Sequence, residues 1–371
     1  MAGADSILRE ARSRLMRLSP CTVVVSGGYG RVAALFIHHA LAGSFKVFYE
    51  AIRCRDITAC ADKILGIPED ATAVVWELES ASISEAAEFV KNFPPAQIAI
   101  TGASGMDGQP GAPESALLSA LACQSSRAVL HYNRDDETVS AAAEALKKSA
   151  LVETRSVGFA GEDVTIKESR SGLGPQGTPE LSAVVSAFGE EHRCHSKIFG
   201  RQNARGMAFA FSVARELGVP SAEIRSGIAE VRFPLGAGGV RRAGCGLVID
   251  ESRGANFDSA SRHIKDLVEF VAPENTAKLA ILGGMGDQGA DLRHQSEVTL
   301  IRACLLDGVY LIGKEWDGIA TEQTSLRGKW DDVEAFMRDF DPASLDGAVT
   351  LVMDSGRYDI SRIFRAEEVA P

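Results

Sequence analysis

A glycine-rich segment near the start of the chain has the spacing of a phosphate-binding loop. The segment SGGYGRV, residues 26–32, follows an apolar run at 21–25 and precedes a helical pattern at 32–41. In a strand–loop–helix unit of this kind, glycines let backbone N–H groups converge on an anion where the helix begins. We therefore predict that Gly27, Gly28, Gly30 and Arg31 bind phosphate.

The same loop lacks the two side chains that such a site uses on its ligand. A lysine normally contacts the outer phosphates, and a Ser or Thr hydroxyl normally binds Mg²⁺. Those positions hold Arg31 and Val32. Arginine binds phosphate as a planar fork rather than as a point charge, and valine has no hydroxyl. Two interpretations stay open: the loop binds an anion or nucleotide, or its glycines form only a tight turn and Arg31 is a solvated charge.

One acid and one histidine segment are further candidates. Glu77 lies in an otherwise apolar run at 74–78. Since apolar strands seldom carry an acid without a purpose, Glu77 is a candidate metal or ligand contact, and the alternative is that it faces water together with Glu79. The segment HRCH, residues 192–195, has metal-binding residue types. Its spacing fits no standard zinc pattern, which favours a surface turn.

Composition limits the classes of function. The chain has 371 residues, 45% of them hydrophobic and 24% charged, as in an ordinary globular protein of two or three domains. A net charge of −11 argues against a nucleic-acid or membrane partner. Seven cysteines without CxxC pairs predict a reduced, cytoplasmic setting. No apolar run reaches the ~18 residues that a membrane span needs.

Apolar runs alternate with helical patterns, which is typical of an α/β fold with mainly parallel sheets. In the first part we predict strands at 22–25, 73–77, 98–101 and 128–131 and helices at 82–93, 114–123 and 206–217. The Gly-, Ser- and Thr-rich stretch 156–181 predicts an antiparallel flap, and FPLGAGG at 233–239 predicts a flexible linker. Beyond it we predict strands at 246–250, 278–282, 309–312 and 349–353 and helices at 259–271, 295–306 and 331–340. The expected division is an N-terminal helix at 1–19 and domains at 20–235 and 236–371.

Several segments resemble motifs of the Mur ligase family, and they occur in the family's order. GRQNARG at 200–206 resembles G-x-H-N-x-x-N, and VIDESRGANFDS at 248–259 resembles VIDD-x-YNANPDS. LGGMGDQG at 282–289, followed by His294, resembles LGDMxELG…H, and LVMDSGR at 351–357 resembles LVKGSR. The first half matches in outline, through DKILGIP at 62–68 and the N-x-D-D turn at 133–136. The similarity is greatest to the ligase that adds D-alanyl-D-alanine.

This resemblance implies a central P-loop-type ATPase domain followed by a C-terminal Rossmann-like domain. It implies ATP and Mg²⁺ as cofactors, and amide-bond formation on a carboxylate through an acyl phosphate. It places Glu77 at the metal, His294 as a further candidate, and the nucleotide at four residues: Asn133, Asn203, Asp250 and Asn256. Two alternatives stay open here, since Asn203 could cap a helix and Asn256 could be a turn residue.

The chain departs from the family pattern at the positions that carry its chemistry. Besides Arg31 and Val32, the metal histidine is Asp107, the carbamylated lysine has no counterpart in 114–123, and the linker arginine falls near Gly238. The LGD aspartate is Gly284, and the KGS lysine is Met353. Only about twenty residues precede the loop, so we expect no UDP-sugar domain.

Two functions from different classes follow from the resemblance and these departures. The first is a non-catalytic or strongly divergent relative with a degenerate ATP site, which binds a nucleotide or metabolite or supports a paralogous Mur-type ligase. The alternative is an active ATP-dependent carboxylate–amine ligase of a biosynthetic pathway. The expected partners are a paralogous ligase or a second copy of the chain, together with a small carboxylate or peptide.

Overall fold

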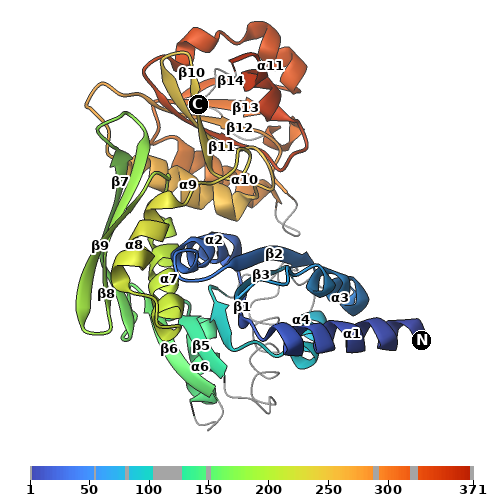
Figure 1. Ribbon diagram of the computed structural model, residues 1–371. Coiled ribbons are helices and arrows are strands. Elements are labelled where there is room, and N and C mark those ends of the chain that lie inside the picture. The colour runs from blue at the N-terminus through green and yellow to red at the C-terminus, as the bar shows by residue number, and fades with distance from the viewer. Residues whose placement is uncertain are drawn as a thin grey trace. The chain divides into compact units, whose positions relative to one another are not determined.

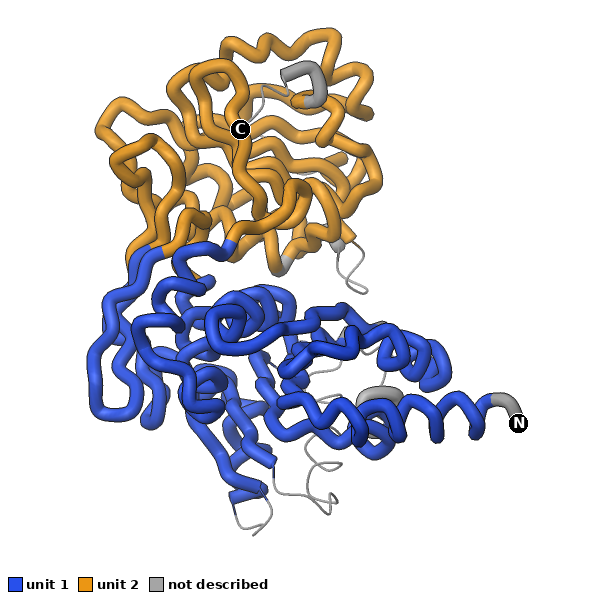
Figure 2. The backbone as a smooth tube through the Cα atoms, in the orientation of Figure 1, with its two compact units in different colours: residues 1–169, 182–195, 203–231 blue, residues 170–181, 196–202, 232–371 orange. Residues whose placement is uncertain are grey.

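The computed structural model describes residues 2–53, 56–79, 83–102, 128–147, 152–286, 292–317 and 325–367. Asp107 and the predicted helix at 114–123 lie outside these ranges. The chain divides into two compact units (Figure 2). The first comprises Met1–Ser169, Ser182–His195 and Asn203–Val231, and the second Arg170–Leu181, Ser196–Gln202 and Arg232–Pro371. Within the described residues, no helix combines the length and the apolar character that crossing a membrane requires.

A nine-stranded sheet lies mainly in the first unit, in the order β2-β3-β1-β4-β5-β6-β7-β8-β9, and the ends of β7 and β8 nearest the turn between them are part of the second unit. The strand pairs from β2 to β6 are parallel, which confirms the predicted α/β class. The strands are β1 (Cys21–Ser26), β2 (Val47–Arg53), β3 (Ala73–Glu79), β4 (Gln97–Ile100), β5 (Ala128–Asn133), β6 (Val152–Gly158), β7 (Val164–Leu173), β8 (Pro179–Ala187) and β9 (Glu190–Ser196). The helices are α1 (Ala2–Leu18), α2 (Gly30–Leu41), α3 (Ile57–Leu65), α4 (Ile83–Asn92), α6 (Glu137–Leu146), α7 (Ala204–Glu216) and α8 (Ser221–Glu230).

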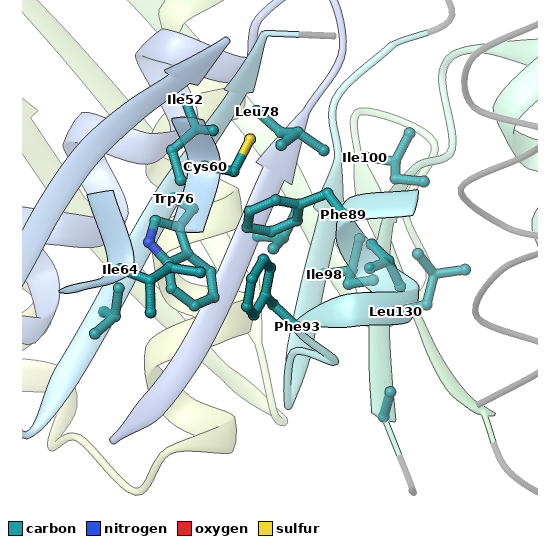
Figure 3. Close-up of a cluster of buried hydrophobic side chains, with 14 of the residues drawn as sticks. Ile52, Cys60, Ile64, Trp76, Leu78, Phe89, Phe93, Ile98, Ile100 and Leu130 are labelled. Atoms are coloured by element: carbon teal, nitrogen blue, oxygen red, sulfur yellow. The ribbon is translucent and has the colours of Figure 1, made fainter. Parts of the chain in front are cut away.

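One hydrophobic cluster of this unit lies on one face of the sheet. Trp76, Phe89 and Phe93 are fully or almost fully buried there, among aliphatic side chains from β1, β3, β4 and β5 (Figure 3). Helices α1, α3, α4 and α6 supply the other half of this cluster. Helices α2, α7 and α8 pack against one another, and α2 also contacts β1, β2 and β3 (Figure 1). Helices therefore cover both faces of the parallel strands, which explains their continuous apolar sequences.

The strand order creates a switch point between β1 and β4. The chain leaves β1 towards β2, on one side, and leaves β4 towards β5, on the other. In open parallel sheets, ligands bind beyond the carboxyl ends of two strands related in this way. The glycine loop, residues 27–30, follows β1 directly, and Thr101 and Gly102 follow β4. The topology therefore places the predicted phosphate loop where a ligand is expected.

The second unit contains a six-stranded sheet, in the order β10-β11-β15-β12-β13-β14. Strand β10 is antiparallel to β11, and the remaining pairs are parallel. Its strands are β10 (Gly239–Ala243), β11 (Gly246–Glu251), β12 (Lys278–Leu282), β13 (Gly308–Ile312), β14 (Leu326–Trp330) and β15 (Val349–Met353). Its helices are α9 (Phe257–Glu269), α10 (Leu292–Ala303) and α11 (Val333–Asp339), with short 3₁₀ segments η1 (Arg201–Asn203), η2 (Lys314–Trp316), η3 (Pro342–Leu345) and η4 (Ile360–Glu367). Two buried clusters, one with α9 and α10 and one with α11 and η4, cover the sheet.

Two predicted segments differ from the structure. The stretch 156–181 is not wholly an antiparallel flap, because its first residues belong to β6, which runs parallel to β5. The side chain of Asp163 shapes the turn that follows by accepting hydrogen bonds from Ser156 N and Oγ, both at 2.7 Å. The predicted flexible linker at 233–239 is a hydrogen-bonded turn, since Ala237 N and Gly239 N both donate to Pro234 O.

Candidate nucleotide site

The glycine loop lies directly against the end of β4. Gly27 has a φ of 104°, a conformation that side-chain-bearing residues rarely adopt. A Cβ atom at this position would lie 2.5 Å from Gly102 O and 2.7 Å from Gly102 N. Only glycine therefore fits at position 27, and the loop and the β4 end share one tightly packed edge.

Two of the loop's amides are hydrogen-bonded within the protein. The Thr101 hydroxyl donates to Ser26 O at 3.0 Å and accepts from Tyr29 N at 3.1 Å. Gly30 N donates to Gly27 O at 2.8 Å. The amides of Arg31 and Val32 follow in the first turn of α2, where a helix leaves its N–H groups without helical acceptors. The loop thus offers an anion fewer amides than its glycine count suggests.

Val32 points towards a helix neighbour. A Cβ atom built on Gly206 of α7 would lie 3.0 Å from Val32 Cγ1 and closer still to the ring of Phe36. Helices α2 and α7 therefore approach so closely that position 206 has no room for a side chain. The residue that stands in place of a magnesium-binding hydroxyl takes part in this helix packing. Arg31 is exposed.

Glu77 is buried, with 6% of its surface exposed, so the alternative that it faces water is wrong. It lies beside Val25 of β1, and the hydroxyl of Tyr49 donates a hydrogen bond to its carboxylate. Among the described residues, no group of three or more His, Cys, Asp or Glu side chains is arranged to hold a metal ion. With Val32 in place of a hydroxyl, the described donors do not make a magnesium site of the expected kind. The metal role of Glu77 stays a prediction.

Asn133 joins the ends of β4 and β5. It is 4% exposed, its amide nitrogen donates to Thr101 O at 2.9 Å, and its amide oxygen accepts from Asp135 N at 3.0 Å. Both ends of the side chain amide therefore hold the switch-point edge together. Its nucleotide role stays a prediction.

Asn203 and Arg205 stand at the start of α7. Asn203 is buried and occupies the N-cap position of α7, as the capping alternative expects, but its side chain makes no capping hydrogen bond. Its nucleotide role stays a prediction. Arg205 Nε donates to Asp135 Oδ2 at 2.9 Å, and its guanidinium carbon lies 5.9 Å from the ring centre of Tyr29 in the glycine loop. No local pattern in the sequence singles out Arg205.

The remaining predicted nucleotide residues belong to the second unit. Asp250 is 1% exposed, forms an ion pair with Arg241 and accepts from Ser252 N at 3.1 Å. Asn256 caps α9: its side chain accepts from Ser259 N at 2.8 Å in a reciprocal capping box. Asn256 is therefore a helix-capping residue at the turn that leads into α9. His294 lies on α10 and is exposed. The nucleotide roles of Asp250 and Asn256 and the candidacy of His294 stay predictions.

Two side chains cover Gly284, the residue at the position of the aspartate in the family's LGD motif. A Cβ atom on Gly284 would lie 2.8 Å from Tyr358 Cε2 and 3.2 Å from Arg357 Cδ. The Tyr358 hydroxyl donates to Glu315 Oε2 at 2.9 Å, and Arg357 forms an ion pair with the same carboxylate. Burial and the hydrogen bond to Glu315 raise the pKa of Tyr358. We call Glu315, Arg357 and Tyr358 the tyrosine cap, and it lies beyond the carboxyl ends of β12, β13 and β15.

Two buried histidines, His192 and His131, lie in the sheet of the first unit. The HRCH segment is not a surface turn but part of β9, with His192 and Cys194 buried. The His192 and Phe211 rings stack with their centres 4.5 Å apart, and burial raises the pKa of Cys194 to about 12.

His131, which no sequence pattern indicated, is fully buried. Its Nε2 lies 2.8 Å from Gln97 Oε1, and its Nδ1 lies 2.7 Å from Ser212 Oγ. Its burial lowers its pKa to about 3, so it is neutral.

Comparison with known proteins identifies the fold. No protein-family model and no curated protein matches the sequence. Among solved structures, MurF ligase from Thermotoga maritima in complex with ADP matches with a TM-score of 0.79 and 22% identity, over 97% of this chain and 82% of that one. MurF from Acinetobacter baumannii matches with a TM-score of 0.79 and 15% identity, over 98% and 80%. The apo form of FPGS from L. casei matches with a TM-score of 0.62 and 14% identity, over 97% of this chain and 94% of that one. The chain has the Mur ligase fold.

Proposed function

We propose that this chain, with its Mur ligase fold, binds a nucleotide or a similar phosphate-bearing metabolite without forming an acyl phosphate. The observation that carries the proposal is the replacement of reactive side chains by packing. Val32 lies against the helix that carries Gly206, and Tyr358 covers Gly284. In both places the family pattern has a group that handles ATP, a metal or the reaction.

The chemistry explains why these changes matter together. Phosphoryl transfer is accelerated mainly by positioning and by cations that neutralise developing charge. An arginine replaces the compact charge of a lysine with a planar fork. Removing one oriented charge from such a site commonly costs ~10²–10³ in rate, so the combined changes remove most of the acceleration.

Support for continued binding comes from the part of the site that remains. The glycine loop stands at the switch point of a parallel sheet, where ligands of open α/β sheets bind. MurF ligase from Thermotoga maritima, which has the same fold, was determined with ADP. Phosphate recognition by a loop and a helix start needs no metal, so binding can persist where catalysis does not.

Calorimetric titration of the full chain with ATP and with ADP, each with and without Mg²⁺, tests the proposal. We expect a binding signal for both nucleotides that depends little on Mg²⁺, and no ADP release from ATP in a coupled assay. The variant Gly27→Ala serves as the blocked-loop control. Absence of any signal at millimolar nucleotide would refute binding, and sustained ADP release would refute the non-catalytic assignment.

The second candidate is an active carboxylate–amine ligase, which the buried Glu77 favours. Its carboxylate accepts a hydrogen bond from Tyr49 and lies beside Val25 in β1, the strand that leads into the glycine loop. The discriminating measurement is ADP release with mixtures of small carboxylates and amines. Release that requires both substrates, and that is lost in Glu77→Gln, would support the ligase.

A further inference from the structure

Arg205 lies beside the glycine loop although it is far from it in the sequence. It precedes Gly206, the position at which α7 touches Val32 and Phe36 of α2. Its guanidinium carbon is 5.9 Å from the ring centre of Tyr29, which stands between Gly28 and Gly30. Because the two helices are in close contact here, the Arg205 side chain lies near Tyr29, which directly precedes α2.

The side chain of Arg205 is held in place before any ligand arrives. Nε donates to Asp135 Oδ2 at 2.9 Å, and the guanidinium carbon lies 5.0 Å from the ring centre of Phe159. Asp135 is fixed in turn, because it accepts hydrogen bonds from Phe159 N at 3.1 Å and Ala160 N at 2.8 Å. A preorganised cation loses little conformational entropy when it binds an anion.

This arrangement leaves most of the guanidinium donors available. An arginine has five N–H donors, and Asp135 takes the one on Nε. Within the described part of the chain, neither Nη1 nor Nη2 of Arg205 has a hydrogen-bond acceptor. The side chain is 22% exposed, so these groups are reachable but only partly solvated. Arginine with free terminal nitrogens is suited to phosphate and carboxylate, which accept two parallel N–H bonds.

We propose that Arg205 binds the phosphate of a ligand at the glycine loop and supplies the positive charge that a loop lysine would otherwise give. The inference rests on the proposed function. It places the positively charged group that contacts phosphate on α7 and not in the glycine loop. Arg31, the residue that the sequence favoured for this role, is exposed and has no ion pair with any residue that the structure describes.

The test compares Arg205→Gln, Arg205→Lys and the control Arg193→Gln, an exposed arginine on β9 at the far edge of the same sheet, by calorimetric titration with ADP and with inorganic pyrophosphate. A charged hydrogen-bond pair of this kind is worth about 10- to 100-fold in affinity, so Arg205→Gln should weaken both ligands by that factor. Arg205→Lys should lose about 3- to 10-fold because it keeps the charge but not the fork. Arg193→Gln should stay within about 3-fold of the unmodified chain, because this exposed side chain is remote from the glycine loop.

The outcomes separate this inference from the proposed function. If the unmodified chain binds neither ligand, both fail. If it binds and Arg205→Gln, folded by circular dichroism, binds equally well, the role of Arg205 is refuted while nucleotide binding stands. A loss confined to ADP contradicts a phosphate contact, since pyrophosphate has no base or ribose. If Arg205→Gln does not fold, the affinity of Arg205→Lys is the test. A loss of about 3- to 10-fold in Arg205→Lys supports the inference, and an unchanged affinity refutes it.

Discussion

Restoring the aspartate of the family motif at position 284 should destabilise the second unit rather than restore a site. In Gly284→Asp, the new Cβ would lie 2.8 Å from Tyr358 Cε2, so the ring has to move. Overpacking of this kind costs roughly 1–3 kcal/mol. Moving the ring also breaks the 2.9 Å hydrogen bond from Tyr358 to Glu315. Such a bond to a charged acceptor contributes about 1.5–3 kcal/mol, and less here because Tyr358 is only half-buried. The expected loss is about 2–4 kcal/mol.

The assay is urea unfolding followed by circular dichroism and by tryptophan fluorescence, to which the buried Trp316 contributes. Gly286→Asp is the matched control, because the nearest atom to a Cβ at position 286 is 3.4 Å away. In a double-mutant cycle, Tyr358→Ser should reduce the cost of Gly284→Asp by at least about 1 kcal/mol, since it removes the clash. The reasoning is refuted if Gly284→Asp is no less stable than Gly286→Asp, or if the two substitutions are additive.

Three further perturbations have defined outcomes. Gly206→Ala should lower the free energy of unfolding by about 1–3 kcal/mol through overpacking, although alanine normally favours a helix; a neutral result in urea would contradict the close contact. Gly27→Ala should abolish calorimetric binding of pyrophosphate, and retained affinity would place the anion elsewhere. The neutral form of His131 stabilises the fold above its unfolded pKa of 6.5, and this stability is lost as the pH falls towards its folded pKa of about 3. Between about pH 7.5 and 5, the unmodified chain should therefore lose ~2 kcal/mol more than His131→Gln in urea unfolding, and parallel pH profiles would contradict this.

The regular elements were predictable because their cause is local. Apolar runs of strand length and helical periodicity depend on neighbouring residues, and β12 and β15 have the predicted bounds. The HRCH segment was predictable too, since buried residues alternate with exposed ones in β9. The prediction of a surface turn was wrong because it rested on the missing zinc spacing and did not consider the two-residue alternation of the segment.

The candidate site was predictable only in part, because its contacts join distant segments. The loop glycines follow from spacing, but the clash between Gly27 and Gly102 depends on strand order. No local pattern connects Arg205 to the glycine loop or Tyr358 to Gly284. The sequence contains one indication of this packing. Gly284 and Gly313 follow two neighbouring parallel strands, and both lie against the ring of Tyr358.

A crystal structure of the full chain with a non-hydrolysable ATP analogue and millimolar MgCl₂ tests the central proposal most directly. We predict that the phosphates lie on the glycine loop and contact Arg205, with no magnesium ion coordinated by Glu77. Two ordered magnesium ions on the phosphates, with Glu77 as a ligand, would contradict the proposal and make this chain a working ligase site.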